Sequence, residues 1–278
     1  MERNRFLVIV RAGDDSLHPR WTDDSLSRRD WDLVVSYFGN DPQRFRGPGE
    51  SRIDDAGPKW KGLHALLSRD RFWQEYQYVW LPDDDLMADQ QTVSDFFSQA
   101  SALNLQLSQP SLSWVSYYAH PVTVRHRSFR YRITNFVEIM APCFHTEFLS
   151  TCLSTFPENL SGWGLDWLWP RLLPPGGRCG IVDTAEVTHT RPIGGPSYRF
   201  TDRTGTTAEE EMNRLKAKFG IPLDDEPRTL SGVDRMGRIL QGPELRAALD
   251  RDWQDFQEYG SMRQGGSNAP AIDLKHDG

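Results

Sequence analysis

The stretch YVWLPDDDLMAD, residues 78–89, places three consecutive aspartates directly after an apolar, aromatic run. The run from Tyr78 to Leu81 is typical of a buried strand, and Pro82 ends it. Adjacent carboxylates repel one another, so Asp83–Asp85 require a compensating environment. A metal ion, the N-terminus of a helix or bulk water would each provide one.

The overall composition narrows the class of protein. The 278 residues suffice for one large α/β domain or two smaller ones. The net charge of -7 argues against a general nucleic-acid binder and gives no attraction to an anionic membrane surface. Cys143, Cys152 and Cys179 lack CxxC spacing, so we expect reduced thiols in a cytosolic protein. The N-terminal apolar run is too short to cross a bilayer, so we expect no transmembrane segment and a cytoplasmic location.

Strand and helix patterns alternate along most of the chain. Apolar runs indicate buried strands at residues 5–13 and 31–38. Further strands are predicted at residues 76–81, 105–112 and 178–192, the last with a polar end. Apolar residues at helical spacing indicate helices at residues 60–67, 92–103 and 146–158. Residues 122–144 alternate polar and apolar side chains, which favours antiparallel or edge strands. The sequence therefore predicts an α/β fold with a mixed, mostly parallel sheet flanked by helices.

The composition changes after about residue 195. Residues 206–220 and 242–260 read as amphipathic helices rich in charge. We therefore expect a catalytic α/β domain at residues 1–198, a helical C-terminal appendage at 199–262 and a disordered tail at 263–278.

The aspartate triplet is the first candidate site. Ligands of open α/β sheets bind outside the carboxyl ends of the strands, where an acidic cluster suits Mg²⁺ or Mn²⁺ and the phosphates of a nucleoside diphosphate. The alternative is that the triplet only caps a helix. His189 also follows an apolar strand, so it either completes a metal shell or is structural.

The second candidate is the segment SGWGLDWLW, residues 161–169. Asp166 lies among tryptophans, where its pKa would be raised as a general base requires. Indole faces would bind sugar rings, although the tryptophans would equally well pack in a core. Glu138, an acid within the apolar run NFVEIM, needs a partner or a role. The arginines of residues 125–132 face either a phosphate or solvent.

The order of these motifs resembles that of a GT-A glycosyltransferase. WLPDDDL is similar to the DxD motif of that fold, and GWGLD is similar to the acceptor loop of β-1,4-galactosyltransferases, with Leu165 where those enzymes have an acid. More closely, the segments YVWLPDDDL, LSQPSLS, NFVEIMAP, GWGLD and IVDTAEVTHTRPIGG resemble an uncharacterised plant and bacterial family labelled only as a domain of unknown function. The likeness covers roughly residues 5–200.

The resemblance implies a GT-A-like (Rossmann-like) fold and a set of roles. The metal, Mn²⁺ or Mg²⁺, would be held by Asp83, Asp85 and His189. The nucleotide-sugar donor would be contacted by Arg11, Gly13, Asp32, Lys59, Asp83 and Asp84. Asp166 would be the catalytic base, and the other substrate contacts would come from Glu138, Trp163, Gly164 and Trp167.

These roles imply a metal-dependent, inverting glycosyltransferase. The donor would be a UDP- or GDP-linked sugar and the acceptor a glycan or glycolipid, as in polysaccharide biosynthesis. One alternative is a sugar-phosphate nucleotidyltransferase, for which RAGDDSLHPR is a poor version of the usual basic loop. The other is a non-catalytic module that binds sugar or metal.

Overall fold

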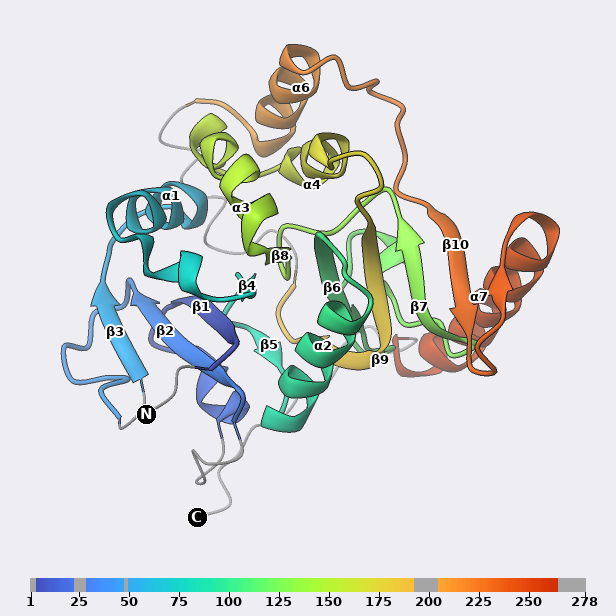
Figure 1. Cartoon of the computed structure of the whole chain (residues 1–278), viewed down its shortest axis with the longest axis horizontal. Helices are drawn as coiled ribbons and strands as arrows, with labels where there is room; N and C mark the ends of the chain where they lie inside the picture. Colours follow the sequence, from blue (N-terminus) through green and yellow to red (C-terminus); the bar gives the residue numbers. More distant parts are fainter. Residues whose placement is uncertain (1–3, 23–28, 48–49, 193–204, 265–278) are drawn as a thin grey trace.

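The computed structural model describes residues 4–22, 29–47, 50–192 and 205–264 (Figure 1). Most of the predicted tail at 263–278 lies outside the described residues. Ten strands form one continuous sheet within this part of the chain, in the order β11-β10-β7-β9-β6-β8-β4-β1-β2-β3, and a short β5 pairs with the end of β9. The α/β class with a mixed sheet flanked by helices is confirmed.

The N-terminal part of the sheet is parallel. It consists of β1 (Phe6–Ala12), β2 (Trp31–Tyr37), β3 (Glu50–Asp54) and β4 (Tyr78–Trp80). Every residue of β1 is buried, because the strand is covered on both faces, which explains its continuous apolar run.

The remaining strands pair antiparallel, except that β6 and β9 are parallel. They are β5 (Leu86–Met87), β6 (Leu107–Leu112), β7 (Phe129–Thr134), β8 (Cys143–His145), β9 (Cys179–His189), β10 (Thr229–Asp234) and β11 (Ile239–Leu240). The expected antiparallel strands of residues 122–144 are thus β7 and β8, but Glu138 lies in the loop between them and not in a strand.

The helices cover both faces of the sheet (Figure 1). They are α1 (Lys59–Arg69), α2 (Gln90–Ala102), α3 (Thr146–Cys152), α4 (Leu165–Leu168), α6 (Ala208–Lys218) and α7 (Gly242–Gln264). Short 3-10 turns extend some of them, among which η5 (Leu153–Glu158) continues α3 and η6 (Trp169–Leu172) continues α4. No helix of the described chain is long and apolar enough to span a membrane.

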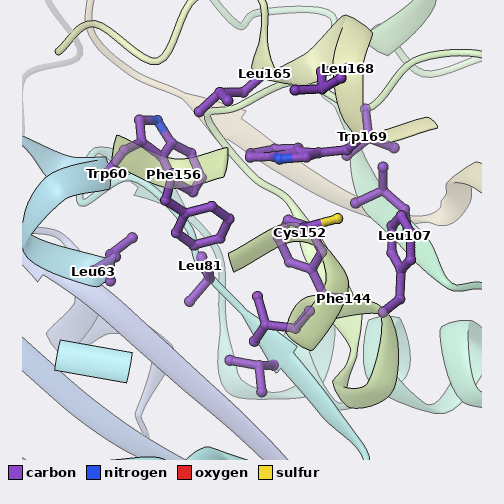
Figure 2. Packing of buried hydrophobic residues seen from close by; sticks show 14 of the residues in the cluster. Trp60, Leu63, Leu81, Leu107, Phe144, Cys152, Phe156, Leu165, Leu168 and Trp169 are labelled. Atoms are coloured by element: carbon purple, nitrogen blue, oxygen red, sulfur yellow. The ribbon is translucent and has the colours of Figure 1, made fainter. Parts of the chain in front are cut away.

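Two hydrophobic cores lie on opposite faces of the sheet. Alternate residues of β1 contribute to each, so that Leu7 and Ile9 join one core while Val8 and Val10 join the other. Figure 2 shows part of the first core, where Trp60 of α1 packs edge-on against Phe156 and Trp169. Cys152 lies in this core. All three cysteines are buried, and none of them forms a disulfide.

The C-terminal region contains strands as well as the expected helices. β10 pairs with β7, and β11 pairs with β10, so this region extends the main sheet. α7 packs against β10, with Leu245 and Ala248 in a small core around Phe129. The domain boundary at residue 198 stays a prediction, but the same sheet runs through both sides of it.

A fully buried ion pair joins β7 to β9. Arg132 donates to both carboxylate oxygens of Asp183 at 2.8 and 2.9 Å, and it also donates to the carbonyls of Val122 and Val124. Both side chains are 0% exposed, so Arg132 is a structural residue rather than a phosphate ligand.

We predict that Asp183→Asn destabilises the protein by about 3–5 kcal/mol, because it leaves a buried guanidinium without its counter-charge. Urea unfolding followed by circular dichroism measures this. Asp70→Asn is the control, since the Arg69–Asp70 pair is exposed and its loss should cost less than about 1 kcal/mol. Equal losses in the two variants would contradict the prediction.

Candidate active site

The aspartate triplet lies where the carboxyl ends of β1 and β4 meet the end of β9. Asp83 forms an isolated parallel bridge with Arg11 at the end of β1. The chain then enters β5, in which Leu86 pairs with His189 at the end of β9. These two pairings bring the triplet, Arg11 and His189 together at the ends of the central strands.

Asp83 pairs with the first residue of α1. Its Oδ1 lies 2.5 Å from the ammonium of Lys59, which also donates to the carbonyl of Ile139 at 2.8 Å. The side chain of Asp83 is 39% exposed, so one side remains open to solvent. Loss of hydration raises the pKa of Asp83, with the charge of Lys59 opposing this shift and that of Asp85 adding to it.

Asp84 points toward the N-terminal strand. Its Oδ2 accepts a hydrogen bond of 2.7 Å from the backbone N–H of Gly13, and its Oδ1 lies 3.3 Å from Arg191. Burial raises the pKa of Asp84 to about 6, although the Gly13 hydrogen bond and Arg191 act against this. A side chain at Gly13 would press against Phe38, 3.2 Å from its ring, so the glycine lets the two loops approach.

Asp85 faces His189. Its Oδ2 lies 3.4 Å from Nε2 of His189, while Nδ1 of His189 donates to the carbonyl of Tyr117 at 2.8 Å. Burial alone would lower the pKa of His189, but the hydrogen bond and charge of Asp85 outweigh it and raise the pKa to about 9. The Tyr117 carbonyl fixes the tautomer and directs Nε2 toward the triplet.

The chemistry of these groups fits a divalent metal ion. Asp85 Oδ1 is buried and has no hydrogen-bond partner among the described residues, so it can accept a ligand bond. Carboxylate oxygens with one imidazole nitrogen form a donor set for Mn²⁺ or Mg²⁺. Within the described ranges no group of three or more His, Cys, Asp or Glu side chains is arranged to hold a metal ion, and Asp83 is paired with Lys59. Asp83 would have to exchange Lys59 for the metal.

Glu138 lies in the β7–β8 loop and is buried near the triplet. Burial raises its pKa to about 7, with His189 lowering and Asp83 raising it. Its backbone N–H donates to Gln109 at 2.7 Å, while its Oε2 finds no hydrogen-bond partner in the described part of the chain. This acid is therefore held close to the metal candidates with one oxygen available.

Asp166 lies in the first turn of α4 and is 3% exposed. Its Oδ1 accepts from the backbone N–H groups of Gly164 and Trp167, each at 3.2 Å. Burial raises its pKa well above the ordinary value, and the charge of Glu138 raises it further. The two acids thus interact, which connects α4 to the aspartate triplet through Glu138.

Helix α6 covers the GWGLD loop. Gly164 adopts a left-handed conformation with φ 95°, and a side chain there would contact Leu215 and Met212 of α6. Glu211 of α6 accepts the backbone N–H groups of residues 160 and 161 at 3.1 and 2.8 Å. Burial lowers the pKa of Lys216 while the charge of Asp166 opposes this, and the ammonium lies 4.2 Å from the ring of Trp167.

The two tryptophans of the loop have different environments. Trp167 is buried against Phe136 and His120, and its indole N–H donates to the carbonyl of Asp225 at 2.9 Å. Its ring therefore belongs to the core and presents no free face to a sugar. Trp163 is only partly buried, so it remains the candidate sugar contact of this loop.

Two of the predicted donor contacts are engaged elsewhere. The guanidinium of Arg11 is buried, with Asp55 at 2.6 Å and the carbonyl of Gly57 at 2.6 Å, so it anchors the segment before α1. Asp32 lies near the start of β2, at the opposite end of the strand from the triplet, and accepts from Asn4 and Tyr76. The structure does not bring Asp32 to the site, because the first residues of parallel strands lie at the opposite end of the strands from the last ones.

Three residues near the triplet were missed by sequence reasoning. Arg191 is 42% exposed and donates to the carbonyl of Asp15 at 2.6 Å beside Asp84. Phe38, exposed at the end of β2, borders Gly13. Tyr117 holds His189. Only the position of Arg191, two residues after His189, gave a signal in the sequence.

The comparisons with known proteins bear on this geometry. No family model and no curated protein matches the sequence. Among solved structures, GalNAc-T7 with UDP, GalNAc and Mn²⁺ aligns with a TM-score of 0.50 and 11% identity, over 77% of this chain and 50% of that one. The fold is GT-A.

S. aureus TarS also aligns, with a TM-score of 0.49 and 14% identity over 98% of this chain and 46% of that one. Its segment 1–349 with UDP-GlcNAc gives 0.46 and 14%, over 69% of this chain and 60% of that one. The chain thus spans roughly half to three-fifths of the length of these neighbours. The predicted GT-A-like fold is confirmed, whereas the resemblance to the uncharacterised family stays a prediction.

The raised pKa of Glu138 predicts a pH dependence of stability. Because the folded pKa, about 7, exceeds the ordinary 4.5, the contribution of this group is fully present below pH 4.5 and is lost as pH rises through 7. We expect Glu138→Gln to gain on the order of 3 kcal/mol relative to wild type between about pH 4.5 and pH 8. Urea unfolding in EDTA measures the difference, with the exposed Glu147→Gln as control. A constant difference across this range would contradict the prediction.

Proposed function

We propose that this protein is a glycosyltransferase that transfers a sugar from a nucleoside-diphosphate donor to a glycan or glycolipid acceptor. The observation that carries the proposal is the aspartate triplet at the sheet edge, with His189 on one side and two cations, Lys59 and Arg191, beside it. Oxygen ligands, one imidazole and flexible cations suit a metal-bound diphosphate. The GT-A fold, and the UDP and Mn²⁺ bound to GalNAc-T7, support it.

The donor would lie between the triplet and the ends of β1 and β2. The exposed ring of Phe38 offers a stacking surface for the nucleobase next to Gly13. Lys59 and Arg191 would turn from their carboxylates toward the diphosphate, which carries more charge. The donor is proposed as a class, a UDP- or GDP-linked sugar.

Asp83, Asp85 and His189 would hold Mn²⁺ or Mg²⁺. When bound, the ion supplies Lewis-acid stabilisation of the charge on the leaving diphosphate. His189 must lose its Nε2 proton to serve as a ligand, and Asp85 must release its contact with that proton. Lys59 and Arg191 stabilise the same developing charge from the protein side.

The acceptor proton would pass to the Glu138–Asp166 pair. The acceptor oxygen forms a bond to the anomeric carbon, the bond from that carbon to the diphosphate oxygen breaks with its electron pair, and the hydroxyl proton goes to a carboxylate. Asp166 is the base that the motif resemblance implies, and Glu138, with a pKa near 7 and an unused oxygen, shares the charge with it. Attack opposite the leaving group inverts the anomeric configuration.

We predict that Asp85→Asn weakens Mn²⁺-dependent binding of UDP about tenfold or more, because it removes a carboxylate ligand. Isothermal titration calorimetry with UDP, with and without Mn²⁺, measures the loss. Asp32→Asn is the matched control, since Asp32 lies at the other end of its strand and should leave UDP affinity unchanged. Undiminished Mn²⁺-dependent binding in Asp85→Asn would refute the proposed metal site.

A second prediction concerns the acid pair. Asp166→Asn and Glu138→Gln should each retain UDP binding but lower the rate of UDP release in sugar transfer about 100-fold or more. Because the two residues act as one unit, the double variant should be no more than about tenfold slower than the slower single variant. Release of pyrophosphate instead of UDP would favour the nucleotidyltransferase. Multiplicative losses would show that the two acids act independently.

A further inference from the structure

The loop of residues 113–120, which follows β6, is fastened to the end of β9. The N–H of Ser113 donates to the carbonyl of Val187 at 2.8 Å, and its hydroxyl lies 2.7 Å from that of Thr188. The N–H of His189 donates to Ser116 Oγ at 3.1 Å. The N–H of Tyr117 donates back to the carbonyl of His189 at 3.1 Å. The loop is therefore a rigid neighbour of the candidate metal ligand.

This rigid loop displays apolar side chains to solvent. Val115 is 42% exposed and Tyr117 is 39% exposed. Tyr118 is partly buried and meets Trp253 and Phe256 of α7 at ring distances of 6.4 and 5.7 Å. An exposed aromatic ring beside a site, such as that of Tyr117, is typical of a ligand contact.

The order of the strands separates Tyr117 from the proposed donor position. β1 and β2, with Gly13 and Phe38 at their ends, lie on one side of the triplet-bearing β4, whereas β6 and β9 lie on the other. A donor on the β1 side leaves the β6–β9 side for the second substrate. Tyr117 lies on that side, joined to His189 by two hydrogen bonds.

We propose that Tyr117, whose chain neighbour Tyr118 packs on Trp253, forms the platform on which the acceptor sugar stacks. This inference rests on the proposed glycosyltransferase function and assigns the main acceptor contact to Tyr117 rather than to the buried Trp167 or the partly buried Trp163. The C–H face of a pyranose packs on an aromatic ring while its hydroxyls remain hydrated or hydrogen-bonded, so the platform takes a sugar residue rather than a charged ligand. Rigid attachment of the loop to His189 fixes the distance from the stacked sugar to the reacting carbon.

The test measures sugar binding to the full chain saturated with Mn²⁺ and UDP or GDP. Saturation-transfer NMR with methyl β-glycosides of glucose, galactose and N-acetylglucosamine gives a dissociation constant for each. Tyr117→Ala should weaken binding of the best glycoside about fivefold to tenfold, whereas Tyr117→Phe, which keeps the ring, should stay within about twofold of wild type. Trp253→Leu should weaken it by a smaller factor.

Tyr259→Ala is the matched control, because Tyr259 is a more exposed tyrosine on α7. Binding of UDP and of GDP in Mn²⁺ is measured on every variant, and the nucleotide that binds is the one used for saturation. Absence of binding of both nucleotides in wild type would defeat the proposed function, whereas intact nucleotide binding with equal glycoside affinity in wild type and Tyr117→Ala would overturn the platform alone. Absence of binding of all three glycosides in wild type would also overturn it.

Discussion

Three consecutive carboxylates are stable at the ends of these central strands only because each turns to a different partner. Asp83 reaches the ammonium of Lys59, Asp84 reaches the backbone N–H of Gly13, and Asp85 reaches His189. The three contacts diverge, so the repulsion between neighbours is met by three separate charges or dipoles. They also tie the start of α1, the end of β1 and the end of β9 to one point, and the rest of the site is positioned from there.

The parallel half of the sheet could be predicted because burial on both faces leaves a local signal. The apolar residues 6–10 of β1 and 33–35 of β2 are such signals. β3, ESRID, and β10, TLSGVD, carry charged or small residues, because they lie toward the edges of the sheet. Their strand structure depends on hydrogen bonds to β2 and β7, which no local pattern reveals.

The same limit applies to the site. The shared location of the triplet and His189 could be predicted, because the triplet follows an apolar strand, His189 ends another, and the ends of such strands meet on one side of the sheet. Asp32 misled because its place within β2, early rather than late, decides the edge on which it lies. Trp167 misled because α6, far along the chain, covers its loop. Sequence gives the residue types near a site, but packing partners from distant segments decide which faces remain open.

The region beyond residue 198 contacts the GWGLD loop directly, so it would take part in shaping the proposed site. Glu211 holds the backbone of the GWGLD loop, and Leu215 fills the space that the absent side chain of Gly164 leaves. Burial under α6 keeps Asp166 poorly hydrated, and this is the main cause of its raised pKa. Burial and the negative charge of Glu138 both raise the proton affinity of Asp166, so the helix that covers this residue would also strengthen it as the proposed base.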